Sequence, residues 1–79
     1  MTDQLTAIIT GGGSGIGEAT SKMMLDAGYE VISVGLHSPD WTHNRFTSIE
    51  VDLLDEEATR ALAKDLAESY KVTHFVHNA

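Results

Sequence analysis

A run of glycines near the amino terminus is the part of the sequence best suited to chemistry. It spans Thr10–Gly17, reads Thr-Gly-Gly-Gly-Ser-Gly-Ile-Gly, and follows a short apolar segment. Because glycine has no Cβ, Gly11 can make a tight turn, Gly15 can let a phosphate approach the backbone, and Gly17 can let a helix pack closely. Amide groups at the start of that helix would point at the phosphate. The loop therefore predicts a site for a diphosphate.

The spacing of the glycines distinguishes this loop from other phosphate loops. A P-loop requires lysine directly after the last glycine, where this sequence has Glu18, whose charge would repel a nucleoside triphosphate. The Gly-x-Gly-x-x-Gly pattern fails whether it is read from Gly11 or from Gly15. The pattern that fits is Thr-Gly-x-x-x-Gly-x-Gly, starting at Thr10.

The elements around the loop can be read from the periodicity of the chain. Short β-branched runs bounded by turn residues predict strands, and apolar residues spaced three or four apart predict helices. The predicted strands are Leu5–Thr10, Glu30–Val34, Thr47–Val51 and Val72–Val76. The predicted helices run from Ser14 or Gly15 to Ala27 and, behind the N-cap Asp55, to about Tyr70. Strands that alternate with helices indicate an α/β fold with a parallel sheet.

Each predicted helix carries one apolar stripe that is expected to face the sheet. The stripe of the first helix consists of Ile16, Ala19 or Thr20, Met23 and Ala27. The stripe of the second helix consists of Ala58, Leu62 and Leu66. Residues 35–45 are expected to form an irregular loop in place of a third crossover helix, anchored on the surface by Trp41.

Two further motifs follow the glycine loop at suitable distances. Asp52–Leu53 comes directly after the third predicted strand, and His77-Asn78-Ala79 ends the fourth. With the opening Thr-Gly-x-x-x-Gly-Ile-Gly, the chain resembles the short-chain dehydrogenase/reductase family, in its compact, non-epimerase branch. The family carries Asn-Asn-Ala-Gly after the fourth strand, so His77 replaces the first Asn. The resemblance implies a Rossmann-type parallel sheet with helices on its faces, here its first four strands in the order 3-2-1-4.

The same resemblance implies that the chain binds NAD or NADP, with Asp52–Leu53 at the adenine. An acidic residue normally ends the second strand, where it holds the ribose hydroxyls and selects NAD. Gly35 occupies that position, followed by Leu36, and the missing carboxylate slightly favours NADP. Side chains that could reach this pocket are those of His37, Ser38 and Arg45. The implied cofactor-binding residues are Thr10, Gly11, Gly13, Ser14, Gly15, Ile16, Gly17, Leu36, His37, Asp52, Leu53, Asn78 and Ala79.

The catalysts of the family are absent from the sequence. They are a Ser and a Tyr-x-x-x-Lys pair, which exchange the proton while hydride passes between nicotinamide and an alcohol or carbonyl. Tyr29 and Tyr70 are followed four residues later by Ser33 and His74, so neither begins such a pair. We therefore expect residues 1–79 to be the N-terminal part of a single NAD(P)-binding domain, truncated before the catalytic and substrate segments and inactive alone. The fourth strand would then form a bare apolar edge.

The complete protein is expected to be an oxidoreductase for a small carbonyl or alcohol substrate, and the resemblance implies a homodimer or homotetramer. Two other functions stay open. A transferase that uses S-adenosylmethionine would also bind its cofactor on a glycine loop, which Gly13-x-Gly15-x-Gly17 fits superficially. A non-catalytic nucleotide-binding or regulatory fragment is compatible with the missing catalysts.

Composition argues against several other classes of protein. The chain has 79 residues, a net charge of −7 and only five scattered Lys and Arg residues, which argues against binding nucleic acid. It has no cysteine, and His74 and His77 would point to opposite faces of a strand, so no metal site is expected. The start of the chain lacks the features of a secretory signal, and no apolar run approaches about 18 residues. We expect a cytoplasmic protein that does not enter membranes.

Overall fold

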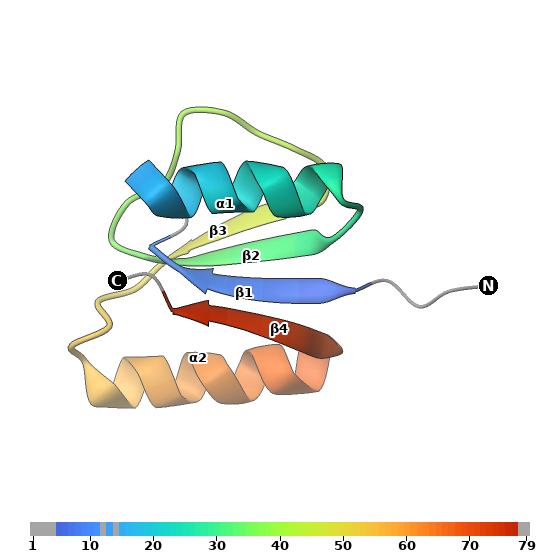
Figure 1. Ribbon diagram of the computed structural model, residues 1–79. Helices are drawn as coiled ribbons and strands as arrows, with labels where there is room; N and C mark the ends of the chain where they lie inside the picture. Colours follow the sequence, from blue (N-terminus) through green and yellow to red (C-terminus); the bar gives the residue numbers. More distant parts are fainter. Residues whose placement is uncertain (1–4, 12, 14, 78–79) are drawn as a thin grey trace.

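The computed structural model describes residues 5–11, 13 and 15–77, and these form four strands and two helices. In chain order the elements are β1 (Thr6–Thr10), α1 (Gly15–Asp26), β2 (Glu30–Gly35), β3 (Phe46–Glu50), α2 (Glu56–Ser69) and β4 (Val72–His77). All three strand pairs are parallel, and the sheet order is β3-β2-β1-β4 (Figure 1). The predicted fold class and strand order are therefore confirmed.

The two helices cover opposite faces of the sheet (Figure 1). The step from β1 to β2 and the step from β3 to β4 run in opposite directions across the sheet. Because parallel crossovers are right-handed, opposite steps place their helices on opposite faces. All four strands have their carboxyl ends on the same side of the sheet, and both helices begin at that end. Ligands of open α/β sheets bind at this end of the sheet, and the described residues of the glycine loop and Asp52–Leu53 lie there.

The core consists of two apolar layers, one on each side of the central strands. On the face covered by α2, Ile8, Ile32 and Val34 pack with Leu66. On the face covered by α1, Ile9 and Val31 pack with Leu25. Side chains of this kind stabilise the fold by about 1.5–3 kcal/mol each when fully buried. The near-continuous apolar runs of β1 and β2 are explained by cover on both faces.

The face that α1 buries differs from the predicted one. Ile16 and Met23 are 77% and 65% exposed, and the buried residues are Gly17, Ser21 and Leu25. Gly17 and Ser21 are buried in place of larger apolar residues because small side chains let the helix axis approach the sheet closely. The hydroxyl of Ser21 is satisfied within the helix, since its Oγ donates to the carbonyl oxygen of Gly17 at 2.9 Å. The prediction of a buried stripe of Ile16, Ala19 or Thr20, Met23 and Ala27 was wrong, and Ala19 and Ala27 are also exposed.

The predictions for α2 are confirmed. Asp55 is the N-cap, and its side chain accepts a hydrogen bond from the backbone amide of Ala58 at 3.1 Å. Leu66 is buried, and Ala58 and Leu62 are half-buried on the same side of the helix. The helix ends at Ser69, where the backbone amide of Tyr70 donates to the carbonyl oxygen of Leu66.

The connection from β2 to β3 is an irregular loop, as predicted, and it passes on the same side of the sheet as α1 (Figure 1). Trp41 anchors it, because its ring packs on Phe46 with a centroid separation of 4.5 Å. The ammonium group of Lys22 lies 5.2 Å from the Trp41 ring centroid, which ties the loop to α1. The loop is thereby held against the helix that starts at the glycine run.

Candidate functional site

The glycine loop lies between β1 and α1, at the carboxyl end of the parallel strands (Figure 1). Gly11 makes the turn out of β1 with a φ of 68°, a conformation that favours glycine. Its amide donates to the carbonyl oxygen of Val34 at 2.9 Å, so the turn is fixed to the end of β2. The structure thus gives Gly11 the turning role that the sequence predicts for it.

Gly15 begins α1 and has a φ of 57°. Apart from its chain neighbours and the backbone of α1, no atom of the described residues lies within 4 Å of a Cβ built on Gly15, so the space beside its backbone is open. The first amide groups of a helix have no partner within the helix and carry partial positive charge. Open space beside such a helix start suits an anion that must come close to the backbone. Gly17, two residues further on, is buried, in keeping with its predicted packing role.

Gly13 serves a purpose that sequence reasoning missed. It is buried, and a Cβ on it would collide with the backbone carbonyl oxygen of His37 and lie 3.3 Å from Cδ of Pro39. The loop after β2 therefore packs directly on the glycine run. Glycine at position 13 allows this contact, so the two loops form one continuous surface.

A pocket of about 320 Å³ opens beside the glycine loop. Its lining consists of Gly11, Gly35, Leu36, His37, Val51, Asp52, Leu53 and Leu54. The ends of β1, β2 and β3 thus contribute together, and residues distant in sequence become neighbours. The pocket unites the predicted residues of the glycine turn, the second strand end and the Asp52–Leu53 pair. It has the apolar walls and few polar groups expected where a flat aromatic ring binds.

The backbone turn after β3 orients Asp52. Its Oδ1 accepts a hydrogen bond from the amide of Leu54 at 2.9 Å, and its carbonyl oxygen accepts one from the amide of Asp55, also at 2.9 Å. Leu53 is half-buried and packs against the core on the α2 side. Asp52 therefore shapes the pocket wall as well as lining it.

Arg45 does not reach this pocket, and that prediction was wrong. Its Nη2 donates to the carbonyl oxygen of Leu25 at 2.6 Å and its Nε to that of Tyr29 at 3.4 Å. The Leu25 carbonyl lies in the last turn of α1 and the Tyr29 carbonyl just before β2, so both are at the end of α1 opposite the glycine loop. A guanidinium group is well matched there, because the last carbonyls of a helix carry partial negative charge, and it binds the Leu25 carbonyl oxygen together with the backbone amide of Gly28, which donates at 3.0 Å.

Ser38 lies at the end of the sheet that carries the pocket, although it is absent from the pocket lining. Its Oγ donates to Oε1 of Glu50 at 3.4 Å and accepts from Oγ of Ser48 at 3.0 Å. Glu50 was not among the predicted site residues. Nothing in its local sequence singles it out, since its position depends on the pairing of β3 with β2.

The end of β4 is joined to the start of the glycine run. Oγ1 of the buried Thr10 lies 3.4 Å from Nδ1 of His77 and 3.5 Å from the carbonyl oxygen of Val76. His77, which departs from the family pattern, therefore contacts the residue that opens the first motif. The predicted residues Ser14, Asn78 and Ala79 lie outside the described part of the chain.

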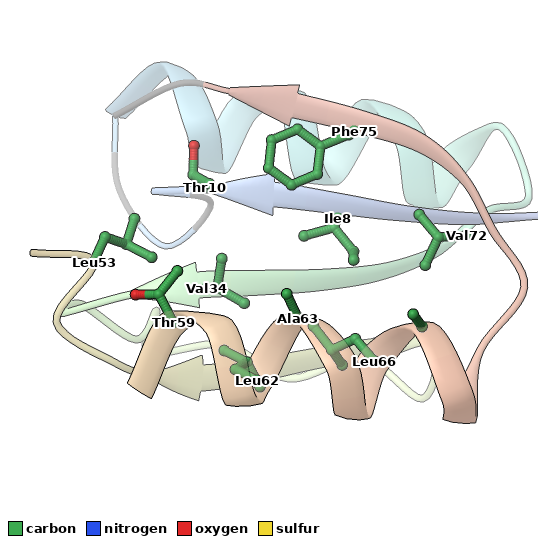
Figure 2. Close-up of a pocket in the computed structure, with 11 residues that line it drawn as sticks. Ile8, Thr10, Val34, Leu53, Thr59, Leu62, Ala63, Leu66, Val72 and Phe75 are labelled. Atoms are coloured by element: carbon green, nitrogen blue, oxygen red, sulfur yellow. The ribbon is translucent and has the colours of Figure 1, made fainter. Parts of the chain in front are cut away.

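A second, apolar pocket of about 290 Å³ lies between α2 and the strands β1 and β4 (Figure 2). Its apolar walls include Leu62, Leu66, Val72 and Phe75, and its polar groups are the hydroxyls of Thr10 and Thr59. Phe75 is 63% exposed on the edge strand β4. Apolar walls of this kind suit contact with apolar side chains better than binding of a charged ligand.

Within the described ranges, no helix is long and apolar enough to cross a membrane. In the same ranges, no three His, Cys, Asp or Glu side chains converge as a metal site would require. The two histidines of β4 are engaged separately, because His74 Nε2 lies 3.4 Å from the hydroxyl of Tyr29 while His77 contacts Thr10.

Comparison with known proteins matches the chain to one family. The family model for short chain dehydrogenases matches residues 5–79. A probable NADP-dependent dehydrogenase of Haemophilus influenzae is 32% identical over 81 residues, covering 92% of this chain and 31% of that protein. Ipsdienol dehydrogenase of Ips pini is 33% identical over 75 residues, with coverage of 91% and 30%. The chain thus spans about a third of the length of these curated relatives.

Solved structures share the fold. A short chain dehydrogenase family protein of Francisella tularensis superposes with a TM-score of 0.85 at 19% identity, covering 98% of this chain and 31% of that one. A short chain dehydrogenase of Leptospira borgpetersenii with bound NAD+ superposes with a TM-score of 0.76 at 24% identity, covering 82% and 26%. At these identities the likeness concerns the fold.

Proposed function

The chain belongs to the short-chain dehydrogenase family, and from this membership we propose that the complete protein is an NAD(P)-dependent oxidoreductase. Residues 1–79 form the N-terminal, cofactor-binding part of a single domain in this proposal. The reaction interconverts an alcohol and a carbonyl compound. Relatives whose names identify them as dehydrogenases support this reading over a transferase that uses S-adenosylmethionine.

One observation carries the proposal: an open helix start lies beside an open pocket. The amides at the beginning of α1 stand next to Gly15, where a Cβ would meet no atom of the described residues within 4 Å beyond its chain neighbours and the helix's own backbone. The pocket lined by Leu36, Asp52 and Leu53 adjoins the same turn at Gly11. A dinucleotide needs both features, one for its paired phosphates and one for its adenine.

The cofactor, when bound, supplies or accepts the hydride, and the residues of this chain bind and orient it. Amides around Gly15 and Ile16 hold the diphosphate, with Ser14 as a further donor. Asp52 and Leu53 face the adenine. Thr10 secures the end of β4, and Asn78 and Ala79, the next residues in the sequence, complete the proposed set. Proton exchange belongs to the Ser and Tyr-x-x-x-Lys of the complete protein, so residues 1–79 alone are inactive.

We further propose that the complete protein works in the cytoplasm, as a homodimer or homotetramer, on a small carbonyl or alcohol substrate. The net charge of −7 supports a small-molecule role over nucleic-acid binding. The slight preference for NADP inferred from the sequence has lost one of its supports, since Arg45 is held at the far end of α1.

A valine in place of Gly15 tests the proposed function. We expect Gly15→Val to weaken binding of NADH and NADPH to the complete protein at least about tenfold, because the side chain fills the space needed by the phosphates. The matched control is Gly28→Val, since Gly28 also has a positive φ (96°) and open surroundings but lies beyond the other end of α1. Both variants should lose about 1–2 kcal/mol of stability from backbone strain.

Calorimetric titration with each cofactor measures the effect, and chemical denaturation measures the shared loss of stability. An equal loss of cofactor affinity in both variants would show that backbone strain, and not a filled phosphate site, lowers the affinity. Unchanged affinity in Gly15→Val would remove the glycine loop from the cofactor site and refute the proposal.

A further inference from the structure

The end of β2 has a carboxylate beside it, although the strand itself lacks one. Gly35, the last residue of β2, pairs in register with Glu50, the last residue of β3. Side chains alternate along a strand, so Glu50 lies on the same face as Phe46, which packs on the α1 side. Gly35 lies on the face of Val31, which belongs to the same layer. No side chain at position 35 separates the Glu50 carboxylate from the strand end.

The carboxylate of Glu50 is turned towards the loop that follows β2. Ser38, in that loop, donates from Oγ to Oε1 of Glu50 at 3.4 Å. Ser38 is itself held by Oγ of Ser48, at 3.0 Å, on the face of β3 that carries Glu50. The same loop packs through His37 and Pro39 on Gly13. These contacts place the negative charge beside the end of β2 and the loop that follows it, whereas Glu50 itself, like Ser38, is not among the residues that line the pocket beside the glycine loop.

The lysine and arginine side chains of the protein are elsewhere, and His37 is the basic residue that lines the pocket. Lys22 stands beside Glu18, with Nζ 3.9 Å from Oε1, and over the ring of Trp41. Arg45 holds the C-terminal end of α1. The remaining basic residues belong to α2 and to the start of β4, and they are Arg60, Lys64 and Lys71. None of the five lines the pocket beside the glycine loop.

We propose that Glu50 determines cofactor specificity and makes the protein prefer NAD to NADP. This inference rests on the proposed function. The carboxylate of Glu50, supplied from β3, stands in for the one missing from the end of β2, where a dinucleotide presents its adenosine ribose. It accepts a hydrogen bond from a ribose hydroxyl and repels a 2′-phosphate, which finds no lysine or arginine to pair with. Rejection of a wrong ligand by an unpaired like charge is a common source of specificity.

The preference has the opposite sign to the one inferred from the sequence. The sequence shows only that position 35 lacks a carboxylate, and that alone favours NADP. The pairing of β2 with β3 restores a carboxylate from 15 residues further along the chain.

The test compares Glu50→Gln with Glu30→Gln in the complete protein. Glu30 is the matched control, because it begins β2 at the opposite end of the sheet and its change removes the same charge. The ratio of NADPH to NADH dissociation constants is measured for each protein by calorimetry. We expect the wild-type protein and Glu30→Gln to favour NADH, and Glu50→Gln to lower the ratio about tenfold, chiefly by tighter NADPH binding.

Two further measurements separate charge from shape. Salt should lower the ratio in the wild-type protein more than in Glu50→Gln, because only the former repels the phosphate by charge. Adenosine 2′,5′-bisphosphate and 5′-AMP probe the adenosine end of the cofactor alone. The ratio of their dissociation constants should change between the wild-type protein and Glu50→Gln in the same direction as the ratio for NADPH and NADH. Ser38→Ala, which releases the carboxylate, should lower the ratio by less than Glu50→Gln does.

The outcomes distinguish the two proposals. A wild-type protein that binds NADPH more tightly than NADH, or a ratio unchanged in Glu50→Gln, overturns the role of Glu50 and leaves the proposed function standing. A wild-type protein that binds neither cofactor overturns the proposed function itself.

Discussion

Gly13 and Gly15 show that neighbouring glycines in one loop are needed for different reasons. At Gly15 the space is open, and the absence of a side chain leaves room for a ligand. At Gly13 the space is filled by the backbone of His37, and the absence of a side chain allows two loops to touch. The first effect concerns binding, and the second concerns the shape of the surface that binds.

Arg45 illustrates a charged residue whose position, and not its type, decides its role. Two donors of its guanidinium group bind backbone carbonyls near the end of α1. Such a residue stabilises the helix end and the start of β3 together. Its guanidinium group is held at the end of α1 opposite the glycine loop, away from the proposed cofactor site.

Replacing Arg45 by methionine checks this assignment. We expect Arg45→Met to destabilise the protein by about 1.5–3 kcal/mol, the range for hydrogen bonds to charged groups, because the carbonyl of Leu25 loses a charged donor. Cofactor affinity should stay within about twofold of the wild-type value, a difference of roughly 0.4 kcal/mol. Urea denaturation measures the first quantity and calorimetric titration the second. A large loss of NADPH affinity without a loss of stability would instead show that Arg45 contacts the cofactor.

At the scale of the element, α1 shows how a helix can bury its less apolar side. The buried residues Gly17, Ser21 and Leu25 lie against the strands, and the more apolar Ile16 and Met23 face outward. Hydrophobic periodicity in a sequence reflects only the apolar character of the side chains. Close packing also depends on how near the helix backbone can come to the sheet, and glycine and serine allow a shorter distance between them.

Truncation of one residue on each side of α1 checks which face is buried. Leu25→Ala should cost about 2–5 kcal/mol, since Leu25 is only 3% exposed and its loss leaves a cavity. Met23→Ala, at a residue 65% exposed, should change the stability by less than about 0.5 kcal/mol. Denaturant unfolding of both variants gives the two values. Equal losses, or a larger loss at Met23, would contradict the orientation of the helix.

At the scale of the whole molecule, the two sheet edges differ. The edge at β3 carries Thr47 and Glu50 among its exposed residues, whereas the edge at β4 exposes Val72 and Phe75 beside the apolar pocket under α2. An exposed strand with apolar side chains invites pairing with another chain. In the described part of the chain β4 is thus a bare edge strand, as inferred from the sequence, but its exposed residues are mixed, since the polar Thr73, His74 and His77 accompany Val72 and Phe75.

A polypeptide of residues 1–79 is therefore expected to self-associate. The substitution Phe75→Lys should shift it towards the monomer, because a charge on an edge strand opposes pairing. Light scattering over a range of concentrations measures the association. Met23→Lys is the control, since it exposes an equal charge on α1, away from the edge. Association that responds equally to both changes would point to a general effect of net charge instead of the β4 edge.

The sequence by itself determined which segments form strands and helices, the glycine turn, and the stripe of Leu62 and Leu66 on α2. These features depend on interactions between residues close in the chain or on strong local patterns. Comparison of the motifs also placed the chain in its family.

Only the tertiary structure decided the buried face of α1, the position of Arg45, the contact between Gly13 and His37, and the carboxylate of Glu50 beside Gly35. Each depends on how two distant segments approach, and that distance is set by packing of the whole sheet. Periodicity records which side chains avoid water, but it does not record which strand will be the neighbour.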